Sequence, residues 1–181
     1  MIMTTSNTKN LVLTALFIAV SFVGAHIRVF ATIAFDSAPG FLAALLLGPL
    51  QGAVIGFLGH LLVALISGFP LSLPIHLTIA LSMAITMVGF GYCYKALKNK
   101  VSEAAALIVT GIVGVILNGP VSLSMSMAMM ALIAGPETAL GLLGMLPILT
   151  LVAAFNIVIA IIIFKSLKRI GVNVDESMDK A

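Results

Sequence analysis

Long apolar runs that hold almost no charged residues constrain the fold of this chain more than any other feature. Of its 181 residues, 61% are hydrophobic and 8% are charged, against roughly 25% charged residues in an average soluble domain. A run of about 20 apolar residues spans a bilayer as a helix. The sequence therefore excludes an ordinary soluble enzyme and predicts an all-α integral membrane protein.

Composition also excludes other classes of protein. Disordered chains combine low hydrophobicity with high charge, which is the opposite of this balance. A disulfide scaffold is excluded because Cys93 is the one cysteine. The net charge of +3 does not imply a nucleic-acid partner, since basic residues gather beside the cytoplasmic ends of spanning helices.

The number of helices depends on the segment from Gly40 to Ile66, which admits one kinked helix or two helices separated at Gly48-Pro49. Separation leaves Arg28 as the one basic residue outside and places on the cytoplasmic side Lys9, Lys95, Lys98, Lys100, Lys165, Lys168, Arg169 and Lys180. We therefore predict one transmembrane domain over residues 1–181 with six transmembrane helices and cytoplasmic N and C termini. The expected helices cover approximately residues 10–27, 39–48, 50–67, 75–97, 102–134 and 140–164.

The second of these helices is short for a membrane span. Residues 40–47 rise only about 12 Å as an α-helix. This helix must begin earlier, tilt, or be shielded from lipid by its neighbours.

The predicted outer connections carry most of the polar chemistry of that side: Arg28 to Pro39, Ser67 to Pro74, and Gly135 to Thr138. Arg28 and Glu137 admit two interpretations, solvated loop groups or ligand contacts. Asp36 stands between apolar residues, where a carboxylate needs a partner. It either caps the following helix or binds a ligand.

Two histidines are expected at membrane depth. His60 falls inside the helix expected over residues 50–67, and His76 falls at the start of the next one. Such residues are candidates for a functional site, although a lone histidine can also bond to a neighbouring helix. The three histidines lack cysteine or acidic residues at metal-ligand spacing, so we expect neither a metal site nor a cofactor.

One polar face is expected on the helix over residues 102–134, where Asn118, Ser122, Met125 and Met129 recur at helical spacing. Pro120 removes a backbone donor, so the helix should distort beside Asn118. The methionines suit an aromatic ligand or ordinary packing. Asn156 is expected to bond between helices.

Small residues form two further repeats. Gly48, Gly52 and Gly56 recur every four residues and predict close helix packing inside the chain. Ala15 and Ala19 form a similar ridge, for which packing against another protein is the alternative.

The helix count, this alanine ridge, the long outer connections and the length resemble the substrate-binding S component of energy-coupling-factor (ECF) vitamin transporters. The stretch from Phe35 to Pro49, with Gly59-His60 and Ser67 to Pro70, is similar to S components for cobamide precursors such as α-ribazole. The resemblance implies a multi-pass protein of the bacterial cytoplasmic membrane. It implies as partners a membrane coupling (T) subunit, contacted through Ala15 and Ala19, and two ATPases. The chain itself has no G-x-x-x-x-G-K-[ST] phosphate loop.

The resemblance also implies a ligand site covered by outer connections. A carboxylate vitamin would favour a cation, and the outer half offers only Arg28 besides histidines, so a neutral or weakly basic ligand fits better. In α-ribazole, ribose hydroxyls would donate to Asp36, the benzimidazole nitrogen would accept from His76 or Asn118, and the ring would stack on an aromatic side chain. The expected substrate-binding residues are Asp36, His76, Asn118, Phe35, Phe30, Arg28, Ser122, His60 and Met125.

Alternative functions remain open from the sequence. The chain could be an S component for thiamine, riboflavin, pantothenate or cobalamin. It could also be a stand-alone secondary carrier, with His60 as its mid-membrane proton site. No catalytic residues are expected, because an enzyme needs convergent acids, a nucleophile–base pair or metal ligands.

Overall fold

The computed structural model describes residues 5–26, 28–30, 33–34 and 36–171, with side chains for residues 8–26 and 36–171. Its elements follow the expected breaks in the chain. They are α1 (Thr5–Gly24), β1 (Arg28–Phe30), β2 (Ile33–Ala34), α2 (Ala38–Leu46), α3 (Pro49–Ile66), α4 (Leu73–Leu97), α5 (Glu103–Ile116), a π-helical turn (Leu117–Val121), α6 (Ser122–Ala134), α7 (Pro136–Gly141), a 3₁₀ turn (Leu142–Met145) and α8 (Leu146–Arg169).

The elements form a bundle of long helices with one small antiparallel hairpin, in which β1 pairs with β2. The prediction of an all-α chain missed this hairpin. The separation at Gly48-Pro49 is confirmed, because α2 ends at Leu46 and α3 begins at Pro49. Proline at the first helical position and a glycine with φ of 110° before it account for this break.

The expectation of six spanning helices is met only in part. Within the described residues, four helical segments are long and apolar enough to cross a membrane: Pro49–Ile66, Leu73–Leu97, Glu103–Ala134 and Pro136–Arg169. Thr8–Gly24 forms a shorter apolar helix. The nine residues of α2 rise only about 13 Å, too little for a bilayer core of about 30 Å.

Neighbouring helices shield α2 completely. All nine of its residues are buried, and it packs against α1, α3, α4 and α8. Phe41, Leu45 and the cluster around them form the main hydrophobic core together with Phe90 of α4 and Phe164 of α8. This short helix is therefore a core element rather than a lipid-facing one, which satisfies the requirement that its ends avoid lipid.

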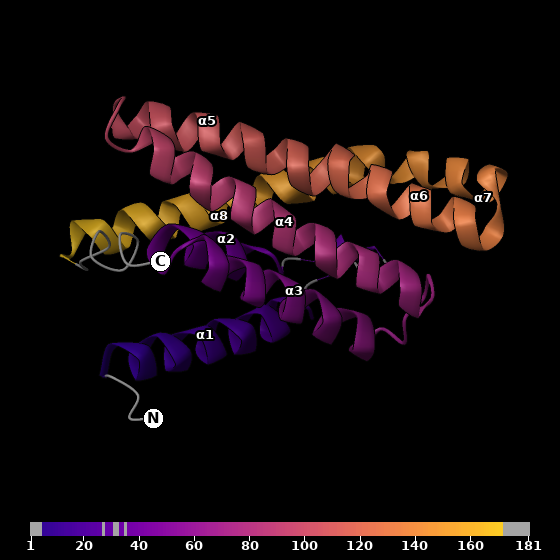
Figure 1. Cartoon of the computed structure of the whole chain (residues 1–181), viewed down its shortest axis with the longest axis horizontal. Coiled ribbons are helices and arrows are strands. Elements are labelled where there is room, and N and C mark those ends of the chain that lie inside the picture. Colours follow the sequence, from indigo (N-terminus) through magenta and orange to yellow (C-terminus); the bar gives the residue numbers. More distant parts are fainter. Residues whose placement is uncertain (1–4, 27, 31–32, 35, 172–181) are drawn as a thin grey trace.

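The two ends of the bundle differ in charge. The start of α1, the α4–α5 connection and the end of α8 lie at one end, on the left of Figure 1, whereas the α3–α4 connection and the α6–α7 junction lie at the other. Every lysine and arginine with a described side chain belongs to the first end: Lys9, Lys95, Lys98, Lys100, Lys165, Lys168 and Arg169. We call the opposite end the outer end, after the orientation predicted from the sequence.

The distortion expected at Pro120 takes the form of the π-helical turn between α5 and α6. Proline cannot donate to the helical ladder, and the wider turn accommodates it. Gly119 lies in this turn, where an added Cβ would meet Thr150 Oγ1 of α8 at 3.0 Å. The turn therefore brings α5 and α6 against α8 at close range.

Candidate functional site

A buried cluster of one carboxylate and two imidazoles lies toward the outer end. Asp36 directly precedes the N-cap of α2, His60 lies on α3, and His76 lies in the first turn of α4. Their side chains are 6%, 5% and 0% exposed. The structure thus brings together three residues that are far apart in the sequence and that we expected to bind substrate.

The three side chains form a continuous line. His60 Nε2 lies 3.2 Å from His76 Nδ1, which is a hydrogen bond. The two rings are stacked, with their centroids 5.4 Å apart. On its other side, His60 Nδ1 lies 3.9 Å from Asp36 Oδ2. His60 therefore connects the carboxylate to His76.

Two buried atoms at the ends of this line have no hydrogen-bond partner among the described residues: Asp36 Oδ2 and His76 Nε2. A buried polar atom without a partner destabilises the folded state, and a buried charge does so strongly. Unpaired buried polar atoms are rare in folded proteins, which makes these two atoms candidates for contact with a ligand or water.

Asp36 does not cap α2, so the capping interpretation of this residue is wrong. The N-cap residue is Ser37, and its side chain makes no capping hydrogen bond. Instead, Asn156 Oδ1 of α8 accepts from the backbone N–H of Ala38 at 3.0 Å, and Asn156 Nδ2 donates to Val152 O. The amide expected to bond between helices does so, and it fixes the start of α2 beside the cluster.

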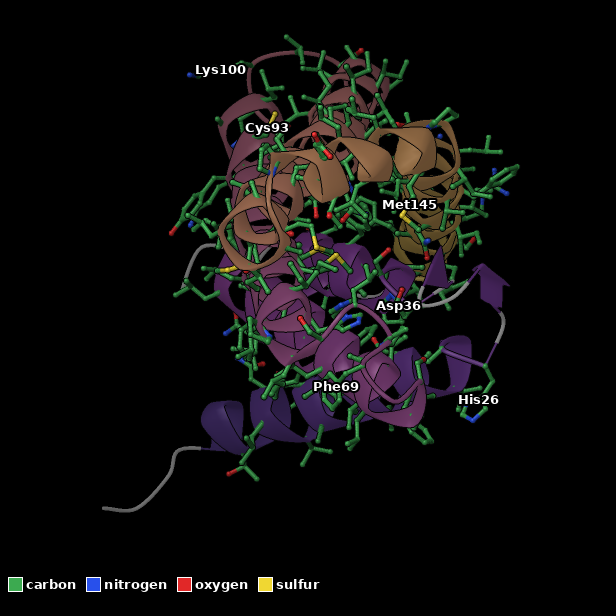
Figure 2. The ribbon with its side chains drawn as sticks, turned by 90° about the vertical axis from the view of Figure 1, so that its right-hand side faces the viewer. His26, Asp36, Phe69, Cys93, Lys100 and Met145 are labelled. Atoms are coloured by element: carbon green, nitrogen blue, oxygen red, sulfur yellow. The ribbon has the colours of Figure 1, made fainter. Side chains whose placement is uncertain are left out.

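The α3–α4 connection covers His76. Phe69 of this connection packs edge-on against the His76 ring, with the centroids 5.8 Å apart. Phe69 and Ser72 both have positive φ angles, of 49° and 82°, which is uncommon outside glycine and is concentrated at functional sites. Figure 2 looks onto the outer end and shows Asp36 near the middle of the view, with Phe69 below it and Met145 above it.

A second polar layer lies deeper in the bundle. Ser82 follows His76 by about 9 Å along the axis of α4, and its Oγ lies 2.6 Å from Ser122 Oγ of α6. Asn118 lies half-buried in the π-helical turn, and no hydrogen bond is described between it and the three residues of the cluster. The structure therefore places Ser122 with this second layer, and the role expected of Asn118 stays a prediction.

The face expected on α6 is shifted from the predicted one. Its buried members are Ser122, Leu123, Ser126 and Met130, whereas Met125 and Met129 are half-buried. Within α6 the buried face follows Ser122, Ser126 and Met130 at intervals of four residues, one position beyond the expected Met125 and Met129. Met125 therefore lies beside the buried face.

Other expected site residues lie outside the described side chains or at the surface. Phe35 lies outside the described residues, and for Arg28 and Phe30 the structure describes only the backbone of β1. Glu137 is exposed in the first turn of α7. Ala15 and Ala19 are exposed on α1, so neither packs inside the chain.

Sequence reasoning missed Ser21 of α1. This residue is 1% exposed, and its Oγ lacks a hydrogen-bond partner in the described part of the chain. An added Cβ on Gly59, the neighbour of His60, would lie 3.2 Å from that Oγ. The available signal was its spacing from Ile18 and Ala25, which places Ser21 on the face of α1 that packs inward.

The same side chains are the natural candidates for metal ligands. Among the described residues, no group of three or more histidine, cysteine, aspartate or glutamate side chains could hold a metal ion. The cluster offers the hydrogen-bonding atoms of one carboxyl group and two imidazoles.

Comparison with known proteins gives one match. Residues 9–172 match the family model described as "ECF transporter, substrate-specific component". No curated protein and no solved structure matches the chain.

Proposed function

The chain belongs to the substrate-specific components of ECF transporters, and from this premise we propose that it binds α-ribazole, or a closely similar neutral cobamide precursor, for import. Membership makes the chain a substrate-binding subunit of a multi-pass membrane importer, not an enzyme. It also implies a small-molecule substrate, a T component and ATPases as partners. The identity of the substrate is the part that we infer.

The observation that carries this proposal is the buried Asp36 Oδ2 without a described hydrogen-bond partner. A carboxylate in this position accepts hydrogen bonds from hydroxyl groups and repels an anionic ligand. All lysine and arginine side chains of the described part lie at the opposite end of the bundle. A neutral ligand rich in hydroxyl groups therefore fits better than a carboxylate vitamin such as pantothenate.

The hydrogen-bonding groups of α-ribazole are of the kinds that the atoms of the cluster can bind. A ribose hydroxyl would donate to Asp36 Oδ2, and the acceptor nitrogen of the benzimidazole would accept from His76 Nε2. Phe69, which already packs edge-on against His76, supplies an aromatic neighbour for the ring, as we also expect of Phe30 and Phe35. Asn118 is the alternative donor to the ring nitrogen.

The orientation of the bundle follows from its charges. We propose that the end carrying the seven described basic residues, with both termini, faces the cytoplasm of a bacterial cell, because cytoplasmic loops hold an excess of lysine and arginine. The cluster then lies toward the outer face of the membrane. Ala15 and Ala19, exposed on α1, are proposed to contact the T component through close helix packing.

The first experiment is native mass spectrometry of the full chain purified in detergent. The ligands are α-ribazole, thiamine, riboflavin, pantothenate and cobalamin, each offered alone and then in competition. We expect a one-to-one adduct with α-ribazole that survives competition. An adduct with another vitamin and none with α-ribazole would contradict the proposed substrate while leaving the family assignment intact.

Replacement of Asp36 tests the site itself. Asp36→Ala removes the acceptor for the ribose hydroxyl, so the Kd for α-ribazole should rise at least about tenfold, which corresponds to about 1.4 kcal/mol. Calorimetric titration of wild type and variant measures this change. Glu137→Ala is the matched control, because Glu137 is an exposed carboxylate of the same end, and its Kd should not change. Equal affinity of Asp36→Ala and wild type would remove Asp36 from the site.

A further inference from the structure

We propose that the Asp36–His60–His76 line is a proton-linked hydrogen-bond switch, which takes up one proton when substrate binds and thereby turns His76 Nε2 from an acceptor into a donor. The inference rests on the proposed function, because it concerns the same ligand site. It adds a role for His60, which need not touch the ligand and acts through His76 as a positioning residue.

The first step concerns the bond between the two histidines. A neutral imidazole carries one N–H and one bare nitrogen. The contact of 3.2 Å between His60 Nε2 and His76 Nδ1 therefore needs an N–H on one side and a lone pair on the other. Two arrangements satisfy this bond, and they leave opposite groups on the outward atoms of the pair, His60 Nδ1 and His76 Nε2.

Asp36 selects between the two arrangements. His60 Nδ1 lies 3.9 Å from Asp36 Oδ2. A bare nitrogen facing a carboxylate oxygen in a buried site is repelled, whereas an N–H is attracted. His60 therefore holds its proton on Nδ1 and accepts at Nε2 from His76. It follows that His76 Nε2 is a bare acceptor in the free protein.

This arrangement conflicts with the acceptor nitrogen of the ligand. A benzimidazole nitrogen placed at His76 Nε2 would set one lone pair against another. One proton taken from solvent resolves the conflict if it resides on His60, which then donates from Nδ1 toward Asp36 and from Nε2 to His76 Nδ1. The proton of His76 moves to Nε2 and is donated to the ligand. The formal charge of the cluster changes from −1 to 0.

No other titratable side chain is described in contact with this line. The nearest described polar groups on α1 and α8 are uncharged: Ser21 lies against Gly59, the neighbour of His60, and Asn156 bonds to the backbone of Ala38. The connection above His76 contributes Phe69. His26, the remaining histidine, is exposed after the end of α1, and its Nδ1 lies 3.0 Å from the backbone oxygen of Phe22. Within the described residues, a proton taken up on binding therefore belongs to the cluster or to the ligand.

The test is calorimetric titration of the full chain with α-ribazole near pH 8, where free benzimidazole carries no added proton. Two buffers with different ionisation enthalpies are compared, since the dependence of the measured heat on that enthalpy counts the protons. We expect uptake of about one proton, and a Kd that rises about tenfold per unit of pH. The indole riboside, in which carbon replaces the acceptor nitrogen, is the ligand control and should take up none.

A variant separates His60 from the rest of the site. His60→Gln can still donate to His76 Nδ1 but cannot take up a proton, so binding should persist without proton uptake. His26→Gln makes the same change at the exposed histidine and should keep the uptake of the wild type. If His60→Gln does not give a monodisperse protein, the comparison of α-ribazole with the indole riboside still decides the question.

A second measurement does not depend on the ligand. Nitrogen NMR of the chain labelled at histidine reports which ring nitrogens carry protons. In the free protein near pH 8 we expect a proton on His60 Nδ1 and none on His76 Nε2, and the opposite pair would overturn the switch. Tight binding of α-ribazole without proton uptake would overturn it as well, leaving the proposed substrate intact. Absence of α-ribazole binding at every pH would instead overturn the proposed function.

Discussion

The helix α2 and Asp36, the residue just before its N-cap, are both buried but differ in whether their polar groups have partners. The residues Ala38–Leu46 are entirely buried, and the helix is held at its start by the amide of Asn156. Asp36 is equally buried, yet its Oδ2 lacks a described hydrogen-bond partner. The bundle thus combines a tightly packed, satisfied core with neighbouring polar atoms that are buried and have no described partner.

The close packing of α2, α3 and α4 depends on glycines, which have no side chain at the points of contact. An added Cβ on Gly52 would lie 2.7 Å from Ala44 Cβ and 2.9 Å from its Cα, and one on Gly91 would lie 3.0 Å from Pro49 Cα. Real Cβ atoms essentially never lie closer than 3.0 Å to another heavy atom, and contacts of 3.0 Å are rare, so the close approach of α3 to α2 and of α4 to α3 depends on these glycines. The packed core of α2, α3 and α4 therefore offsets the cost of burying the polar atoms of the cluster.

The largest loss of stability is expected from adding a methyl group inside the packed region. Gly52→Ala forces α2 and α3 apart, and we expect a loss of about 3 kcal/mol of unfolding free energy, the upper end of typical overpacking effects. Thermal unfolding in detergent, followed by size exclusion, measures it. Gly141→Ala is the matched control, because nothing lies within 4 Å of the added atom. Equal stability of the two variants would contradict the close packing of α2 on α3.

The next variant acts at the boundary between the two regions. Asn156→Ala leaves the N–H of Ala38 without its acceptor in a buried place, so unfolding free energy should fall by about 1–3 kcal/mol. The Kd for substrate should also rise, since Asp36 lies two residues before Ala38. Asn99→Ala, on the exposed α4–α5 connection, serves as control and should match the wild type in both measurements. A destabilised variant with unchanged Kd would show that the start of α2 does not position the site.

The smallest change in stability is expected for a variant of the polar cluster itself. Asp36→Ala removes a buried carboxylate whose Oδ2 accepts no described hydrogen bond, so the stability of the ligand-free protein should stay within about 0.5 kcal/mol of the wild type or increase. The same thermal unfolding assay measures this, beside the loss of affinity expected for the same variant. A loss of stability as large as that of Asn156→Ala would show that Asp36 supports the fold rather than the ligand.

Much of the helix layout could be predicted from local sequence. The break at Gly48-Pro49, the distortion at Pro120 and the gathering of basic residues at one end follow from backbone chemistry and charge, which act within a few residues. The β1–β2 hairpin was missed because its strands are too short to produce a periodic pattern. The buried face of α6 was missed because positions three and four residues after Ser122 fit one helical face equally well, and packing buries Ser126 rather than Met125.

The sequence predicted which residues form the candidate site better than it predicted how they are arranged. Asp36, His60 and His76 stood out because buried ionisable residues are rare in apolar segments. Their order in a line, with His60 in the middle, depends on how α3 rotates against α4. Ser21 packs against Gly59, the neighbour of His60, because glycine lets α1 approach α3 closely there.

By itself, the sequence determined that the chain lies in a membrane, where its helices break and which end carries the basic residues. These properties depend on hydrophobicity, proline, glycine and charge, each of which acts locally. Only the tertiary structure decided that α2 is wrapped by protein and that two histidines and a carboxylate share a line of contacts. Those outcomes depend on the rotation and close approach of helices that are distant in sequence, which no local pattern fixes.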